Sequence, residues 1–157
     1  MLFRSIGDQS TDEDTDFTID LSASDVDIDE NGQTLTFSAV SGDSSLVVVT
    51  AATLDDGTTG TLTFDVQDEQ NGSAEITVTV TDSEDGTAVE TFALVVNAVN
   101  DVPILTEIGD QPTVADSDIT LVLSASDVDI DENGQTVTSI AVIDDSSLVD
   151  VFATTLD

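Results

Sequence analysis

Cysteine, histidine, tryptophan and tyrosine are all absent from this sequence of 157 residues. Without thiol or imidazole groups, the chain can form no disulfide, no zinc site of the usual kind and no nucleophilic triad. Only catalysis by a pair of carboxylates stays possible, and hydrolases hold such a pair in a deep cleft that small modules rarely have. The composition therefore argues against an enzyme.

Basic residues are almost absent as well. The sequence has 34 Asp and Glu residues and one Lys or Arg, Arg4, so its formal net charge is −33. Such a chain is repelled by the phosphates of nucleic acids. Its own carboxylates also repel one another in the folded state unless cations or high ionic strength screen them. We therefore expect bound divalent cations or a saline habitat, and no nucleic acid partner.

Long hydrophobic runs are missing too. No apolar run approaches the roughly eighteen residues of a membrane span, and residues 1–5 are too short for the apolar region of a signal peptide. An extracellular protein without cysteine needs another means of holding small modules together, and metal ions are the usual substitute. We expect an extracellular module with no membrane insertion, whose targeting signal lies elsewhere in a longer chain.

An internal repeat is the most informative positive feature. The string LSASDVDIDENGQT occupies Leu21–Thr34 and recurs at Leu123–Thr136, 102 positions later. The same offset relates IGDQ, DSSLV and TLD on either side of the string, without a gap. Identity at this level indicates recent tandem duplication, and a period of about 100 residues indicates that each copy is a domain.

Apolar and polar residues alternate through the first copy. Five runs show this period of two: residues 17–23, 35–39, 62–66, 74–80 and 92–98. Runs of this kind, rich in Thr, Val and Phe, predict half-buried antiparallel strands. A first strand before Asp8 and a short one at Leu46–Val49 bring the total to about seven, and no stretch has a convincing helical period. Turns are predicted at Asn31-Gly32, Asp56-Gly57, Asn71-Gly72 and Asp85-Gly86.

About seven short strands in 100 residues predict an all-β fold, a Greek-key β-sandwich of the immunoglobulin-like type. We expect residues 1–99 to form one sandwich, residues 100–103 to form a linker ended by Pro103, and residues 104–157 to form the N-terminal half of a second. A half sandwich exposes apolar faces such as those of Ile119, Leu121, Leu123, Val137 and Ile143. Another molecule is expected to complete it, so self-association through this half is predicted.

Each copy of the repeated string has an acidic turn in which oxygen-bearing side chains alternate before a glycine. These residues are Asp27, Asp29, Asn31 and Gly32, and then Asp129, Asp131, Asn133 and Gly134. Oxygen ligands at alternate positions can converge on one hard cation such as Ca²⁺, and glycine permits the tight bend. An EF-hand is excluded, because its twelfth position would be Ser38 or Ile140 where a bidentate Glu is required.

The simpler alternative is that these are solvated turn residues, since Asp, Asn and Gly are common in turns. However, Asp25, Asp27, Asp29 and Glu30 lie within six positions with no basic neighbour, and the second copy repeats them. Carboxylates at this density repel strongly unless a cation lies among them. The pattern therefore favours a metal site over a bare turn.

These residues resemble the cadherin-like tandem repeats of large bacterial surface adhesins, and the resemblance extends over the whole chain. The DxD pair and following NG of that family are similar to Ser24-Asp25-Val26-Asp27 and Asn31-Gly32. Its acidic residue at the end of the penultimate strand is similar to Asp82 in Val80-Thr81-Asp82. Its N-D-x-P linker is similar to Asn100-Asp101-Val102-Pro103, which is the most specific match.

The resemblance implies calcium at the junction between modules, bound by the upstream base, the linker and the downstream tip. The implied ligands are Glu13, Glu69, Asn100, Asp101, Asp127, Asp129 and Asn133. The first module's own tip would offer Asp25, Asp27, Asn31 and Asp82 without an N-D linker upstream, and should bind calcium more weakly. Two positions depart from the family pattern near Glu69 and Glu13: Gln67 stands where animal cadherins have an acid, and Ala115 replaces Glu13 in the second copy.

The expected function is therefore that of a calcium-binding spacer repeat in a long secreted bacterial adhesin, of the kind that acts in cell adhesion and biofilms. Its expected partners are the neighbouring repeats of the same chain. One alternative is a carbohydrate-binding module that recognises a polysaccharide, although the absence of Trp and Tyr removes the usual stacking surface for sugars. A second alternative is homophilic adhesion through the sandwich faces.

Overall fold

A computed structural model describes residues 2–28, 32–54, 57–130 and 134–143. The chain divides into two compact units, Met1–Val99 and Asn100–Asp157. Among the described residues, no helix has the length and apolar character that crossing a membrane requires.

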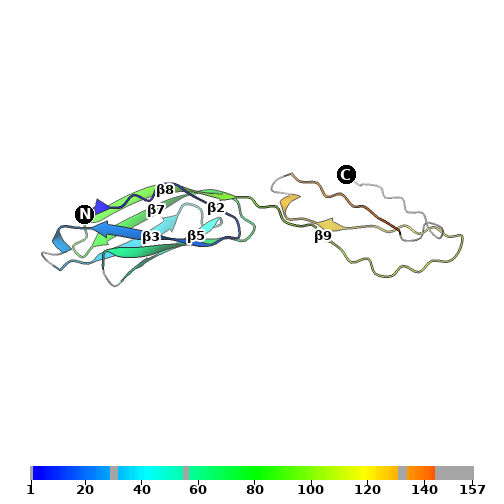
Figure 1. Cartoon of the computed structure of the whole chain (residues 1–157), viewed down its shortest axis with the longest axis horizontal. Coiled ribbons are helices and arrows are strands. Elements are labelled where there is room, and N and C mark those ends of the chain that lie inside the picture. Colours follow the sequence, from blue (N-terminus) through cyan, green and yellow to red (C-terminus); the bar gives the residue numbers. More distant parts are fainter. Residues whose placement is uncertain (1, 29–31, 55–56, 131–133, 144–157) are drawn as a thin grey trace. The chain divides into compact units, whose positions relative to one another are not determined.

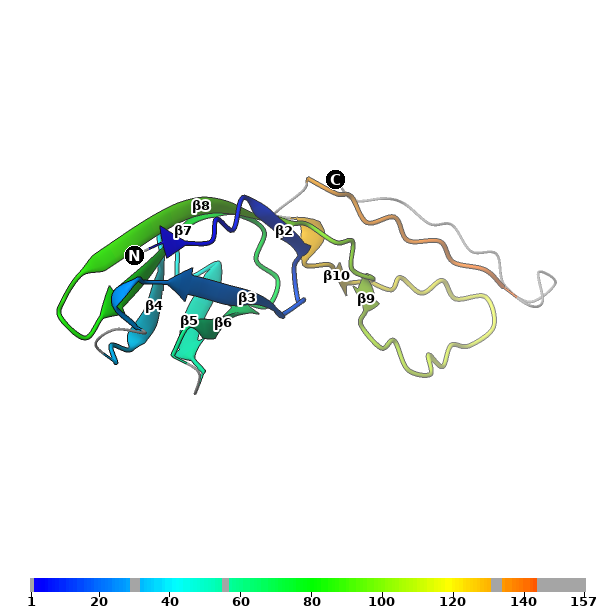
Figure 2. The ribbon, with the colours of Figure 1, turned by 60° about the vertical axis from the view of Figure 1, so that its left-hand side comes forward.

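The described part of the first unit forms two four-stranded sheets that face each other (Figures 1 and 2). One sheet has the order β1-β3-β6-β5 and the other β2-β8-β7-β4. The strands are β1 (Leu2–Phe3), β2 (Gln9–Asp12), β3 (Phe17–Ser24), β4 (Leu35–Ser41), β5 (Val47–Thr53), β6 (Thr59–Val66), β7 (Gly72–Asp82) and β8 (Thr87–Asn97). This arrangement confirms the predicted all-β immunoglobulin-like sandwich.

One hydrophobic core fills the space between the two sheets. The alternating runs turn Leu21, Leu62, Ile76 and Leu94 inward, and each is at most 1% exposed. Phe64 lies at the centre of the aromatic contacts, stacked on Phe17 with ring centroids 4.2 Å apart and edge-on to Phe92 at 6.3 Å. Because each fully buried side chain of this size contributes about 1.5–3 kcal/mol, the core accounts for the stability of the first unit.

β1 is the strand predicted before Asp8, and a second strand that was not predicted, β2, follows that residue. β1 pairs antiparallel with β3, whereas β2 pairs parallel with β8 in the other sheet. The break between β1 and β2 falls at Gly7, whose φ of +69° is readily adopted only by glycine. The N-terminal segment thus crosses from one sheet to the other and covers an edge of each, which leaves fewer unpaired strand edges.

A short helical turn, which the sequence pattern did not predict, begins the acidic loop after β3. Asp27 and Ile28 are helical, and the Gly32 amide donates to the Ile28 carbonyl at 3.1 Å. The Asp25 carboxylate accepts a hydrogen bond from the Asp27 amide at 3.0 Å, in the manner of a helix cap. A turn of this length is too short to leave a helical period in the sequence.

The second unit repeats local details of the first. β9 (Ile104–Leu105) pairs antiparallel with β10 (Ala125–Ser126), in the same register that joins β1 to β3 after the offset of 102. The next backbone hydrogen bond is repeated too, from Arg4 to Ser22 at 3.0 Å and from Thr106 to Ser124 at 2.8 Å. The duplicated sequence therefore specifies the same local pairing in both copies.

The rest of the described second unit has no further strand, and its apolar residues are exposed or half-buried. Ile119 is 49% and Leu121 42% exposed, while Leu123, Val137 and Ile143 are intermediate. In the first unit, the equivalent strands β3 and β4 pair with β6 and β7. At the repeat offset of 102 residues, the positions that correspond to β6 and β7 have numbers above 157. Residues 144–157 of the predicted half sandwich lie outside the described residues. Its completion by another molecule stays a prediction.

Candidate functional site

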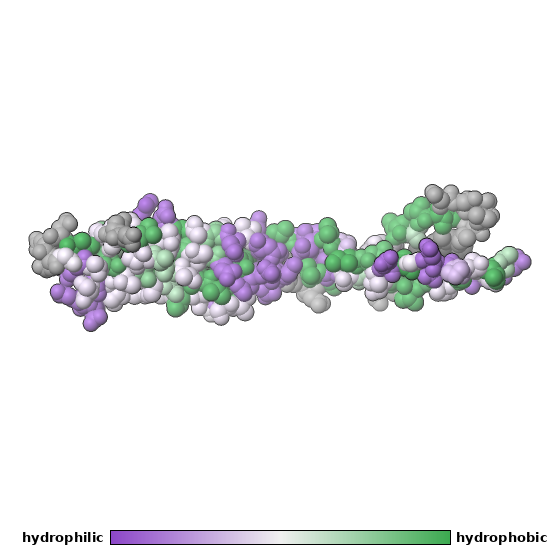
Figure 3. All heavy atoms as spheres, turned by 90° about the horizontal axis from the view of Figure 1, so that it is seen from below, coloured by the Kyte–Doolittle hydropathy of each residue, from purple (hydrophilic) through white to green (hydrophobic). Residues whose placement is uncertain are grey.

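Acidic side chains of the first unit gather at the two ends of the sandwich. We call the end at Ser24, Leu35, Thr59 and Asp82 the tip, and the opposite end, at Phe17, Ser41, Val66 and Gly72, the base. Between these ends, threonines occupy many of the outward positions of the strands. Figure 3 shows hydrophilic residues at both ends of the first unit, and paler or hydrophobic ones between them on the side drawn.

Described acidic residues at the tip are Asp25, Asp27, Asp82, Glu84 and Asp85. Those at the base are Asp12, Glu13, Asp14, Asp16, Asp43, Asp65, Asp68 and Glu69. In a chain whose one basic side chain is Arg4, most of these groups cannot be neutralised by ion pairs within the protein. Each end therefore has an unbalanced negative charge that favours cation binding.

The acidic turn has the same geometry in both copies. The Asp27 amide donates to Asp25 Oδ1 at 3.0 Å, and the Asp129 amide donates to Asp127 Oδ1 at 3.1 Å. The hydrogen bond from the Asp27 amide is the main reason that the pKa of Asp25 lies below its ordinary value. Asp25 therefore stays ionised at neutral pH, and its small stabilising effect is lost only as the pH falls through the lowered pKa.

Four acidic-turn residues named in the sequence analysis, Asp29, Asn31, Asp131 and Asn133, lie outside the described residues. The assignment of Asn31 and Asn133 as calcium ligands, which the resemblance implied, thus stays a prediction.

Asp82, a predicted metal ligand, closes the turn between β7 and β8. Its Oδ1 accepts hydrogen bonds from the amides of Glu84 and Gly86, both at 2.8 Å. Asp85 in the same turn has a φ of +68°, and a Cβ at position 86 would overlap the Asp82 carboxylate. This structural role was missed in the sequence analysis, although D-x-x-D-G is a recognisable turn pattern.

Replacing Asp82 with alanine should lower the free energy of unfolding of the first unit by about 1–2 kcal/mol, because two amides of the turn lose their acceptor. Asp82→Asn should retain most of the stability, since its amide oxygen can accept the same bonds. Urea unfolding in the presence of a chelator measures this effect apart from any metal. Equal stability of the alanine variant and the wild type would show that the turn does not depend on these bonds.

Glu13, which follows β2 at the base, is held by backbone and side-chain hydrogen bonds. Its Oε1 accepts from the Val99 amide at 2.6 Å, and its Oε2 accepts from Asn71 Nδ2 at 3.5 Å. The side chain is only 3% exposed. Hydrogen bonds from within the first unit thus hold both carboxylate oxygens of Glu13.

Glu69 lies in the turn between β6 and β7, with a φ of +57°. Its amide donates to Asp14 Oδ1 at 2.9 Å, so the turn is tied to the loop that carries Glu13. The structure therefore brings the two predicted base ligands to the same end of the first unit.

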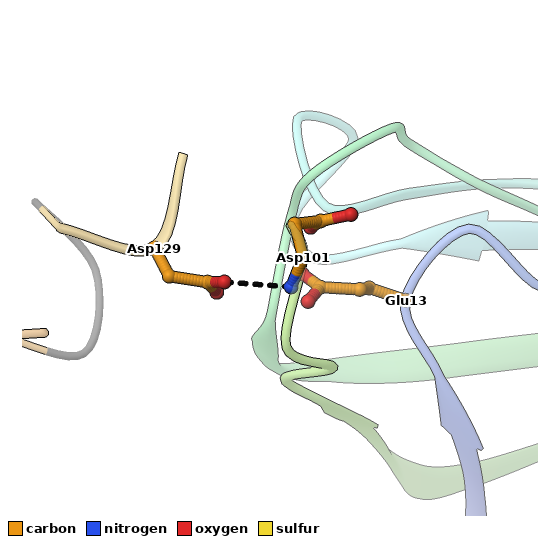
Figure 4. A group of neighbouring side chains, drawn as sticks. All are labelled: Glu13, Asp101 and Asp129. Carbon is orange, nitrogen blue, oxygen red and sulfur yellow. Dashed lines mark hydrogen bonds between the residues drawn. The ribbon is translucent and has the colours of Figure 1, made fainter. Parts of the chain in front are cut away.

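The linker residues are hydrogen-bonded to the acidic turn of the second unit. The Asp101 amide donates to Asp129 Oδ2 at 2.7 Å (Figure 4), and Gln135 Nε2 donates to Asn100 Oδ1 at 3.1 Å. Within this unit, hydrogen bonds thus join Asp101 to Asp129 and Asn100 to Gln135. That Asn100, Asp101, Asp127 and Asp129 bind calcium stays a prediction. The sequence analysis did not identify Gln135. The one feature of the sequence that points to it is its position directly after Asn-Gly in the repeated string.

The first unit, a sandwich of two four-stranded β-sheets, has an immunoglobulin-like fold. The chain belongs to the bacterial Ig domain family, whose model matches residues 4–95. Domains of this family are typically structural modules without catalytic activity, and they are commonly extracellular.

Two further comparisons add little to this assignment. The crystal structure of CopC from Methylosinus trichosporium OB3b is similar with a TM-score of 0.41 and 15% sequence identity, over 64% of this chain and 97% of that chain. No curated protein sequence matches this chain.

Proposed function

We propose that this chain is a calcium-binding spacer from a long, secreted bacterial surface adhesin, in which calcium stiffens the junction between successive Ig-like repeats. Membership of the bacterial Ig domain family and the tandem duplication support the role of a repeated structural module. The observation that carries the calcium part is the position of the linker: Asn100 and Asp101 lie against the acidic turn of Asp127 and Asp129.

The residues present fit a calcium ion. Ca²⁺ takes six to eight oxygen ligands, mostly from carboxylates, amides and backbone carbonyls. Asp101, Asp127 and Asp129 supply carboxylates within one unit, and Asn100 supplies an amide. The side chains of this group contain no sulfur or imidazole ligand, which disfavours zinc and copper.

Glu13 would add an upstream carboxylate. It binds the Val99 amide, and Asp129 binds the Asp101 amide only two residues further along the chain. Two residues of extended chain reach about 7 Å at most, so both carboxylates are tethered to one short segment. Bound calcium supplies positive charge to this segment. The carboxylates would then attract a shared ion instead of repelling each other, which restricts bending at the junction.

Calcium should stabilise the folded chain. For an extracellular module we expect a dissociation constant of about 10⁻⁴ to 10⁻³ M. At a free calcium concentration ten times that constant, one ion that binds only the folded state adds about 1.4 kcal/mol to the free energy of unfolding. Urea unfolding with chelator and with calcium, at constant ionic strength, measures the difference. If the two unfolding curves coincide, calcium is not a ligand of this fold.

A further inference from the structure

The linker is held by protein groups alone, before any ion is considered. In the second unit, the Asp101 amide donates to Asp129 Oδ2 at 2.7 Å, and Gln135 Nε2 donates to Asn100 Oδ1 at 3.1 Å. One bond fixes the backbone of the linker and the other fixes a side chain. Beyond them, Pro103 has a restricted φ and also limits the conformations of Val102. The segment from Asn100 to Pro103 is thus restrained on the downstream side.

The residue just before this segment is fastened to the first unit. The Val99 amide donates to Glu13 Oε1 at 2.6 Å, and the Glu13 amide donates to the Asn97 carbonyl at 2.9 Å. Between the two fastened amides, those of Val99 and Asp101, no hydrogen bond to the backbone of Asn100 is found among the described residues. The unrestrained backbone torsions are therefore those of Val99 and Asn100.

We propose that hydrogen bonds to Asp129 and Gln135 hold the linker, residues 100–103, against the rest of the second unit in the absence of metal. Bending between the units is then confined to the backbone of Val99 and Asn100. Gln135 is then a positioning residue, which presents Asn100 and Asp101 to the acidic turn. The inference adds to the proposed calcium site but stands without it, because every bond that it uses forms between protein groups.

The first copy contains a natural comparison. Gln33 occupies the same position in the repeated string as Gln135, but it lies two residues before Leu35 at the tip of the first unit, at the opposite end from Val99 and Glu13. Gln33 is only 9% exposed, and its Oε1 is the one buried side-chain oxygen or nitrogen among the described residues without a hydrogen-bond partner. Substituting Gln33 therefore changes the same kind of side chain without touching the segment from Asn100 to Pro103. Gln33→Leu is therefore a matched control for Gln135→Leu.

The experiment is ¹⁵N relaxation and amide hydrogen exchange on the full chain in the presence of a chelator. In the wild type, the Asp101 amide should be protected and its order parameter should approach the value of about 0.85 found in rigid backbone. Gln135→Leu and Asn100→Ala remove the two sides of one hydrogen bond. Each should speed exchange at Asp101 by about fivefold and lower the order parameters of Asn100 and Asp101.

Gln33→Leu should leave exchange at Asp101 unchanged, and the amides of β7 and β8 should keep their protection in all three variants, which checks that the first unit stays folded. The proposal is overturned if the Asp101 amide of the wild type exchanges like an unstructured peptide, or if its order parameter is below about 0.6, the range of flexible backbone. It is also overturned if Gln33→Leu and Gln135→Leu change the linker equally. Because chelator is present throughout, these outcomes are independent of whether calcium binds.

Discussion

Replacing Phe64 with alanine is expected to lower the free energy of unfolding of the first unit by about 3–5 kcal/mol, the usual cost of removing a buried phenyl ring. The side chain is fully buried, is stacked on Phe17 and meets the edge of Phe92. Alanine would leave a cavity between the two sheets, and the paired strands on both sides prevent the core from collapsing into it.

Urea unfolding followed by far-ultraviolet circular dichroism measures this change. Phe64→Leu is the control, since it keeps most of the apolar volume and should cost considerably less than the alanine variant. An alanine variant within about 1 kcal/mol of the wild type would mean that the aromatic contacts do not form the centre of the core.

Replacing Asp127 or Asp129 with alanine is expected to abolish most of the stabilisation by calcium, about 1.4 kcal/mol at ten times the dissociation constant. The Asp129→Ala variant would lose a proposed calcium ligand and the acceptor of the Asp101 amide. The Asp127→Ala variant would lose a proposed ligand and the acceptor of the Asp129 amide. Isothermal titration calorimetry with calcium measures the loss of binding directly.

Asp118→Ala is the matched control, because Asp118 is an exposed carboxylate of the same unit and the variant changes the net charge by the same amount. Calcium binding should survive in this control. The response to sodium chloride should be similar in all variants, because screening over a Debye length of about 8 Å does not depend on one coordinated ion. If the three variants lose calcium binding equally, calcium acts only as a diffuse counterion of an acidic surface.

The strands that the sequence predicted well are those with a long alternating pattern. β3, β6, β7 and β8 alternate over eight or more residues between an apolar core and solvent, so their periodicity identifies them. The second N-terminal strand, β2, could not be predicted in the same way. It depends on Gly7, whose positive φ redirects the chain to the second sheet, and a glycine alone does not indicate which strand the chain will pair with next.

The site was predictable to the extent that its residues are close in sequence. Asp127, Asp129 and the linker residues form short patterns, and the structure places Asn100 and Asp101 against that turn. The environment of Glu13 was not predictable, because its burial depends on Val99 and Asn71, which are distant in sequence. Gln135 was missed for a similar reason, since a single glutamine gives no sign of its acceptor until the fold is known.

Small-angle X-ray scattering on a protein of two complete repeats can show whether calcium stiffens the junction between them. The scattering is compared with chelator and with calcium at the same ionic strength. An ion shared by the carboxylates that bind the Val99 and Asp101 amides would restrict bending, so we expect a larger maximum dimension and a narrower range of dimensions with calcium. Identical scattering curves in the two conditions, at calcium well above about 10⁻³ M, would contradict it.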